Sequence, residues 1–251
     1  MLNLTIKQLT EITQGRRAVG SMPPLDGDLQ EIRRLIPLGD EVLEGDVVVI
    51  GGSLDRTAHG FGESAFVQGA KGVICSGPVT PWDGTFAVNV PCVRTALSRL
   101  AQWHRHRFMG TLVAVVEESE GAGPWHDLAA VGLHPHQSAC PSHDLLWQLL
   151  QLDTNAATEI LACSLPNCCH RSIQIAAPDI LVVPSRESSV DTAPSDFVTE
   201  TLELDVSVRM LEPVVTEQTT IVAPTQLTAW RTLAETRAAN WVPYEPQRPG
   251  S

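Results

Sequence analysis

The stretch from Val113 to Leu133 holds the residues whose types and spacing come nearest to a recognisable chemistry. It reads VAVVEESEGAGPWHDLAAVGL, so apolar β-forming residues run into a small, polar, glycine-containing loop, and this loop opens an apolar-periodic helix. A strand, such a loop and a helix in this order are typical of phosphate sites, where backbone N–H groups and the helix N-terminus attract the anion. The pattern predicts the outline of a nucleotide site.

The same loop lacks the side chains that such a site needs. A triphosphate loop uses a lysine to reach the β- and γ-phosphates and a serine or threonine to hold magnesium. The corresponding positions hold Ala122, Gly123 and Pro124. The chain has two lysines, Lys7 and Lys71, both far before the loop. We therefore expect a segment with the pattern of a nucleotide site but without the side chains that such a site needs. It is either a nucleotide site of altered type or an ordinary acidic turn.

Histidines and cysteines after the loop offer ligands of the type that zinc prefers. The spacing H-x-H-x3-C-x2-H is formed by His134, His136, Cys140 and His143. This spacing matches no standard zinc arrangement and falls in an expected loop, so we predict no metal and keep these four residues as secondary candidates. For Cys163, Cys168 and Cys169 we expect thiols rather than ligands, since adjacent cysteines rarely both bind one metal well.

Composition excludes several classes of function. The chain has 251 residues and a formal net charge of −12, whereas a nucleic-acid partner requires a basic patch. No apolar run approaches the roughly 18 residues that cross a membrane, and the amino-terminal segment lacks the features of a signal peptide. Six scattered cysteines do not form a secreted disulfide framework. We expect a cytoplasmic protein in which Cys75 and Cys92 are buried thiols.

Hydrophobic periodicity predicts two α/β domains and a tail. The first domain covers 1–108, the second covers 109–240, and 241–251 is a flexible tail rich in proline. Expected helices cover 2–14 (with Thr5 as cap), 61–70, 92–107, 124–133, 142–152 (with Ser142 as cap), 167–176, 195–211 and 225–239. Expected strands cover 45–52, 72–77, 86–90, 111–116, 158–163, 178–184 and 219–224. Strands separated by helices in the second domain imply a parallel sheet with right-handed crossovers.

Several segments, in order, resemble the Mur ligases, and among them the type that adds D-alanyl-D-alanine to UDP-N-acetylmuramoyl-tripeptide. LTIKQLTEITQG is similar to the family's opening helix, and LEGDVVVIGG, His59 and SAFVQGAKGVICS are similar to its uridine-nucleotide domain. TALSRLAQWHRHRFMGTLVAVV resembles the helix leading into the central ATPase domain, and DLLWQLLQLD, TEILACS and IAAPDILVV resemble later segments. The resemblance implies a small amino-terminal α/β domain followed by a truncated, P-loop-type, Rossmann-like central domain.

The family's catalytic signature departs nearly everywhere. Its phosphate loop, G-S/T-x-G-K-T-T, falls on Glu118, Ser119, Glu120, Gly121, Ala122, Gly123 and Pro124, of which Ser119 and Gly121 match. The resemblance places the family's magnesium glutamate on Ile160, its carbamylated lysine near Ser207 and its uridine-contacting Asp-Ser-Arg on 38–40. Another polar segment of the family falls on 223–225. His59 is a matched position, so a UDP-sugar ligand would be held on its side.

These observations lead to a functional hypothesis with one alternative. We expect a Mur-ligase-like protein that is catalytically inactive and serves a binding or scaffold role linked to peptidoglycan precursor synthesis. We expect no cofactor, and a protein partner or self-association through the second domain. The alternative is an ATP-dependent ligase that adds D-Ala-D-Ala to UDP-N-acetylmuramoyl-tripeptide, and it alone would require ATP and Mg²⁺.

Overall fold

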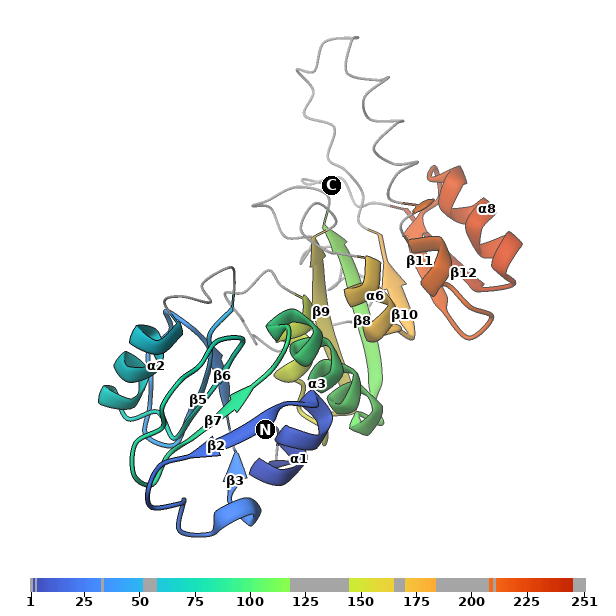
Figure 1. The fold of residues 1–251 in the computed structure, drawn as a ribbon. Helices are drawn as coiled ribbons and strands as arrows, with labels where there is room; N and C mark the ends of the chain where they lie inside the picture. The colour runs from blue at the N-terminus through green and yellow to red at the C-terminus, as the bar shows by residue number, and fades with distance from the viewer. Residues whose placement is uncertain are drawn as a thin grey trace, which may run out of the picture. The chain divides into compact units, whose positions relative to one another are not determined.

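The computed structural model describes residues 2, 4–32, 34–51, 58–117, 145–164, 170–183, 208–209 and 211–245. The chain divides into two compact units, whose course is drawn in Figure 1. The first comprises Met1–Arg107 with Leu150–Leu152, and the second comprises Phe108–Leu149 with Asp153–Ser251. In the described part of the chain, no helix combines the length and the apolar character needed to cross a bilayer.

The first unit is built on a five-stranded sheet with the strand order β2-β7-β6-β5-β4. Its strands are β2 (Arg16–Val19), β4 (Leu35–Pro37), β5 (Val47–Val49), β6 (Gly72–Cys75) and β7 (Phe86–Asn89). Strands β4 to β7 run parallel, while β2 joins β7 antiparallel. The three strands expected in this region are confirmed. The sequence does not predict β2 or β4, because both are short and lack a long apolar run.

Helices α1 (Ile6–Thr13), α2 (Ala58–Val67) and α3 (Val93–Arg107) complete the first unit, together with a short 3-10 turn, η1 (Gly27–Leu29). A capping box begins α1: the Thr5 hydroxyl accepts the Gln8 N–H at 3.2 Å, and the Thr5 N–H donates to the Gln8 side chain at 2.9 Å. Thr5 is thus confirmed as the cap. The helix begins later than expected because β1 (Leu4–Thr5) pairs with β3 (Glu31–Ile32).

The apolar core of the first unit ties α2 to one face of this sheet. Ala65 and Phe66 of α2 lie in one cluster with Val48, Val73 and other sheet residues. Close packing extends to β6, where a Cβ on Gly72 would lie 2.4 Å from the ring of Phe86. Glycine is therefore required at the start of β6 for the Phe86 ring to keep its place.

The second unit is built on a five-stranded parallel sheet with the order β12-β11-β10-β8-β9. Its strands are β8 (Thr111–Glu117), β9 (Thr158–Ser164), β10 (Ile180–Val182), β11 (Thr220–Pro224) and β12 (Asn240–Tyr244). The expected parallel sheet is confirmed. Numbered by position in the chain, the order is 2-1-3-4-5, so the connections reverse direction between β8 and β10.

The expectation of a flexible tail from residue 241 is wrong for its first four residues. Asn240–Tyr244 form β12, which pairs with β11 through five residue pairs. Pro243 and the absence of an apolar run made this segment look like a tail. The strand forms because β11 already offers a parallel hydrogen-bonding edge, which a sequence pattern does not reveal.

Helices α5 (Leu145–Leu150), α6 (His170–Ala176) and α8 (Thr228–Arg237) belong to the segments expected to be helical, and η2 (Glu212–Val214) is a 3-10 turn. Figure 1 shows α8 beside β11 and β12, which it contacts. It ends at Ala238, whose φ is 54°. The helix expected at 124–133, the cap Ser142 and nearly all of 195–211 lie outside the described residues.

Both edges of the second sheet carry devices that hinder further strand pairing. On β9, the side-chain amide of Gln148 donates to the Ala162 carbonyl at 2.9 Å and accepts the Ala162 N–H at 2.8 Å, as a neighbouring strand would. At the start of β12, the Asn240 N–H donates to the carbonyl of Thr219, the residue before β11. Backbone groups point to alternate sides along a strand, so those of Trp241 and Pro243 point away from β11. Pro243 has no N–H, which removes one outward donor.

One edge of the first sheet is protected in the same way. The Leu38 N–H donates to Val49 on β5, so the backbone groups of Leu35 and Pro37 point away from the sheet. Pro37 therefore removes an outward donor from β4, as Pro243 does from β12. The opposite edge is formed by β2, whose four residues are all exposed and include no proline.

His104 joins the chain segment after α5 to the first unit. It is fully buried on α3, and its Nε2–H donates to the Leu152 carbonyl at 2.9 Å, while Nδ1 has no hydrogen-bond partner among the described residues. This bond explains why Leu150–Leu152 cluster with the first unit instead of the expected domain 109–240. Burial lowers the pKa of His104 below its ordinary 6.5, because an imidazolium would lose its hydration there.

We predict that the neutral His104 ring makes stability depend on pH. The unfolded chain takes up a proton near pH 6.5 while the folded chain does not, so this stability is complete above 6.5 and is lost as the pH falls from there toward the lower folded pKa. Urea unfolding should show that the advantage of the wild type over His104→Gln shrinks below pH 6.5, by at most about 1.4 kcal/mol per pH unit. Exposed His106→Gln is the control, and parallel curves for wild type and His104→Gln would contradict the prediction.

Candidate functional site

The carboxyl end of β8 is the place in the second unit where a ligand is expected on topological grounds. In open parallel sheets, ligands bind outside the carboxyl ends of the strands at the point where strand order reverses. Here that point lies between β8, which ends at Glu117, and β10, which ends at Val182. Strand β8 ends at this reversal point (Figure 1), and Glu118 to Pro124 are the residues that follow it in the sequence.

The residues singled out from the sequence fall mostly outside the described part of the chain. This holds for the loop residues Glu118, Ser119, Glu120, Gly121, Ala122, Gly123 and Pro124, and for His134, His136, Cys140 and His143. The backbone of His59 lies in the first turn of α2, and its side chain is not described. Among the described residues, no group of three or more His, Cys, Asp or Glu side chains is arranged to hold a metal ion.

One face of the second sheet carries an apolar cluster that includes residues of β8 and β10. Val113, Val115 and Val182 form a buried cluster against which Tyr244 packs. The hydroxyl of Tyr244 donates to the Val183 carbonyl at 3.2 Å, so a side chain from β12 reaches past β11 to the end of β10. Sequence reasoning missed this residue because it assigned Tyr244 to the tail.

The resemblance assigns polar groups of the family to certain positions of this chain. In the second sheet these positions hold apolar residues or lie far from the carboxyl ends of the strands. Ile160 lies opposite Val113 and packs against the apolar cluster, four residues before the end of β9. Glu159 points to the other face, as its neighbouring position in a strand predicts, and accepts the Asp153 N–H at 3.1 Å. At about 3.3 Å per residue, Glu159 lies roughly 17 Å before the carboxyl end of β9. Ala223 is buried, and Ser207 lies outside the described residues.

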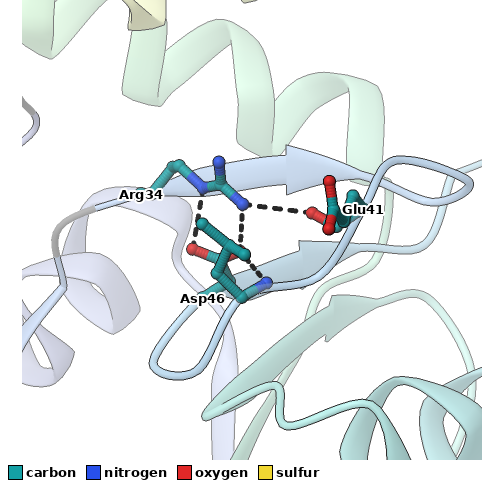
Figure 2. A network of polar contacts seen from close by, with 4 residues as sticks. Arg34, Glu41 and Asp46 are labelled. Atoms are coloured by element: carbon teal, nitrogen blue, oxygen red, sulfur yellow. Dashed lines mark hydrogen bonds and ion pairs between the residues drawn. The ribbon is translucent and has the colours of Figure 1, made fainter.

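A second place of interest is the loop between β4 and β5 in the first unit, where the family's uridine contacts would fall. Figure 2 shows that Arg34 and Asp46 close this loop. Arg34 donates from Nε to Asp46 at 2.8 Å, from Nη2 to the other oxygen of the same carboxylate, and from Nη2 to the Glu41 carbonyl at 3.1 Å. The Leu43 N–H adds a bond to Asp46 at 2.8 Å. The loop is thus held by a two-pronged ion pair.

The charge of this loop does not favour an anionic ligand. The hydrogen bonds between Arg34 and Asp46 engage the guanidinium with a carboxylate of the chain and raise its pKa. Asp40 and Glu44 are exposed in the same loop. Leu38, the first of the three positions compared with the family, packs against the apolar core instead of facing a ligand.

Cys75 and Cys92 lie in different surroundings, although both were expected to be buried. Cys75 is buried as predicted, and its thiol donates to the Gly77 carbonyl at 3.1 Å. The expectation is wrong for Cys92, which is exposed because Pro91 ends the strand and leaves Cys92 just before α3. Hydrogen bonds from Thr95 lower the pKa of the Cys92 thiol.

We predict that Asp46 contributes more to stability than the exposed ion pair of Arg231 with Glu235. Asp46→Ala leaves the Leu43 N–H without its acceptor and the Arg34 guanidinium with the Glu41 carbonyl alone, which should lower the free energy of unfolding by about 2 kcal/mol. Glu235→Ala is the control, because its pair with Arg231 is exposed on both sides, and it should cost at most about 0.5 kcal/mol. Urea denaturation measures both, and equal losses would contradict the prediction.

Comparison with known proteins gives likeness at the level of structure. No protein-family model matches the sequence, and no curated protein matches it. The MurF ligase of Acinetobacter baumannii superposes with a TM-score of 0.67 at 15% identity, covering 97% of this chain and 54% of that one. The MurF ligase of Thermotoga maritima in complex with ADP gives 0.60 at 19% identity, covering 86% of this chain and 51% of that one.

At these identities the likeness concerns the fold. The chain spans about half the length of the solved structures it matches. Within that span its mixed α/β architecture, with the parallel sheet of the second unit, is of the Mur-ligase type.

Proposed function

We propose that this Mur-ligase-like protein binds rather than ligates, and that it serves a non-catalytic role linked to peptidoglycan precursor synthesis. The observation that carries this proposal is the segment from Glu118 to Pro124, which follows β8 in the sequence and has neither a lysine nor a Ser/Thr next to where the lysine would be. The link to peptidoglycan rests on the likeness of the fold to MurF ligases.

Electrostatics support the absence of ligation. Phosphoryl transfer depends on positioned cations that neutralise developing charge. Glu118 and Glu120 would bring carboxylates toward a polyanion, and at about 4 Å like charges repel by several kcal/mol in a protein environment. No lysine follows Lys71, so the second unit has none.

Two described arginines of the second unit are already engaged with carboxylates. Arg231 pairs with Glu235 at 2.9 Å and Arg237 with Glu212 at 3.0 Å. Arg171 is exposed at the start of α6, which follows the carboxyl end of β9. It is the described cation best placed in sequence to approach a ligand there, so Arg171→Ala is the variant to use if nucleotide binding is found.

The proposal includes a protein partner or self-association. Addition of a partner strand to the second sheet is disfavoured. Gln148 occupies the outward groups of Ala162 on β9, and Pro243 removes an outward donor from β12. A UDP-sugar on the side of His59 also stays a prediction. The acidic loop between β4 and β5 supports no phosphate contact of its own.

We predict that the wild type neither binds nor hydrolyses ATP. Calorimetric titration with ATP and Mg²⁺ should show no binding stronger than about 1 mM, and released phosphate should not exceed that of a protein-free control. The alternative, an ATP-dependent ligase, is favoured by the ADP that the Thermotoga maritima MurF structure contains. Micromolar affinity or turnover would establish that alternative and refute our proposal.

A variant that restores the family's residues sharpens the same test. Glu118→Gly with Ala122→Lys and Gly123→Thr supplies the missing cation and hydroxyl and removes one carboxylate, so ATP·Mg²⁺ should bind at least about tenfold more tightly than to the wild type. Replacing Lys by Gln at position 122 in the same background is the matched control, and it should lose that gain. No difference between the two would mean that charge is not what the loop lacks.

A further inference from the structure

The edge of β2 is the place where the first sheet is open to another strand. The Phe86 N–H donates to the carbonyl of Lys71, the residue before β6, so the backbone groups of Phe86 face β6. Because these groups alternate in direction along a strand, those of Ala87 and Asn89 face β2. Because Ala87 pairs with Ala18 and Asn89 with Arg16, the backbone groups of Arg17 and Val19 point outward.

These outward groups have no hydrogen-bond partner within the described residues. The other three edge strands of the two sheets each carry a blocking feature, namely Pro37 on β4, Pro243 on β12 and Gln148 over β9. Natural sheets blunt their edges in such ways because an exposed row of N–H and C=O groups pairs with other chains. Among the described edges of the two five-stranded sheets, the β2 edge alone lacks such a feature.

Side chains around β2 indicate the chemistry of its partner. Arg17 forms an ion pair with Asp28, whereas Arg16, also exposed, has no carboxylate partner among the described residues. Val19 is 38% exposed and Met22 64% exposed. Met22 is held against the turn 82–85, because its N–H donates to the Asp83 carboxylate at 3.0 Å and its carbonyl accepts the Gly84 N–H at 2.8 Å.

We propose that β2 receives an extended, acidic segment of a partner protein as a sixth strand of the first sheet. Backbone bonds to Arg17 and Val19 supply affinity, and side chains supply specificity, as in other strand additions. An acidic residue of the segment pairs with Arg16, as Asp28 already pairs with Arg17, and an apolar residue three positions along lies across from Val19. A second copy of this chain fits less well, since it would place two Arg16–Arg17 pairs side by side.

This strand addition rests on the proposed binding role, and it places that role at the β2 edge. The test uses fluorescein-labelled peptides of alternating Glu and Val, and the same peptides with Lys for Glu. The Glu peptide should bind more tightly than the Lys peptide by at least about tenfold at low salt, and the difference should shrink as salt screens the charges. On binding, the Arg17 and Val19 amides should gain protection from hydrogen exchange.

Two matched pairs of variants separate the backbone contribution from the charge. Val19→Pro deletes an outward N–H that the folded sheet does not use, and it should weaken Glu-peptide binding roughly tenfold, while Val19→Thr keeps that N–H and should bind as the wild type does. Arg16→Glu should abolish the preference for the Glu peptide, and Lys7→Glu, which changes the net charge equally on α1, should leave it intact. Circular dichroism confirms that each variant is folded.

Several results would overturn the inference. Equal binding of both peptides would remove the charge argument, and unchanged binding by Val19→Pro would remove strand addition. Dimers seen by light scattering and lost in Val19→Pro would make a second copy the occupant. ATP turnover by the wild type would refute the proposed function without affecting these readouts, so the two failures are distinguishable.

Discussion

The parallel hydrogen-bond ladder among β9, β8 and β10 is the constraint on which the second unit depends. The chain leaves β8 toward β9 on one side and leaves the neighbouring β10 toward β11 on the other, so two adjacent carboxyl ends lead in opposite directions. A ligand crevice is expected at such a point whatever the loop contains. The valines of β8 and β10 stabilise this ladder by burial and involve no group that a nucleotide needs. The shape of the site and its chemistry are therefore independent, and one can persist while the other changes.

Charge is distributed in a way that agrees with this separation. Arg34, Arg231 and Arg237 each pair with a carboxylate of the chain itself. Around the sites suggested by the fold, the charges that the sequence supplies are mostly acidic, namely Glu118 and Glu120 in one unit and Asp40 and Glu44 in the other. On the proposed function, these carboxylates disfavour a polyanionic ligand at both places. Arg16 is exposed on β2 and has no carboxylate partner among the described residues, so it favours an acidic ligand instead.

The sheet edges also differ from one another. Those of β4, β9 and β12 carry features that hinder pairing with another strand, whereas the β2 edge does not. Proline at an outward position and a side-chain amide that imitates a peptide group both remove pairing sites without disturbing the sheet. Such devices act through single residues, Pro37, Pro243 and Gln148, whose role depends on which way a backbone group points. Each is an ordinary residue when read from the sequence.

The sequence by itself determined the apolar strands, the helices and their alternation, because burial periodicity and capping are local properties that Val113–Val116 or Thr5 display directly. It also fixed the composition of the loop after β8, and so the absence of lysine there. Only the tertiary structure decided that 240–244 are a strand, that Leu152 joins the first unit through His104, and that the β2 edge is open. These features depend on partners distant in the chain, whose hydrogen-bonding edges exist only after the sheets have formed.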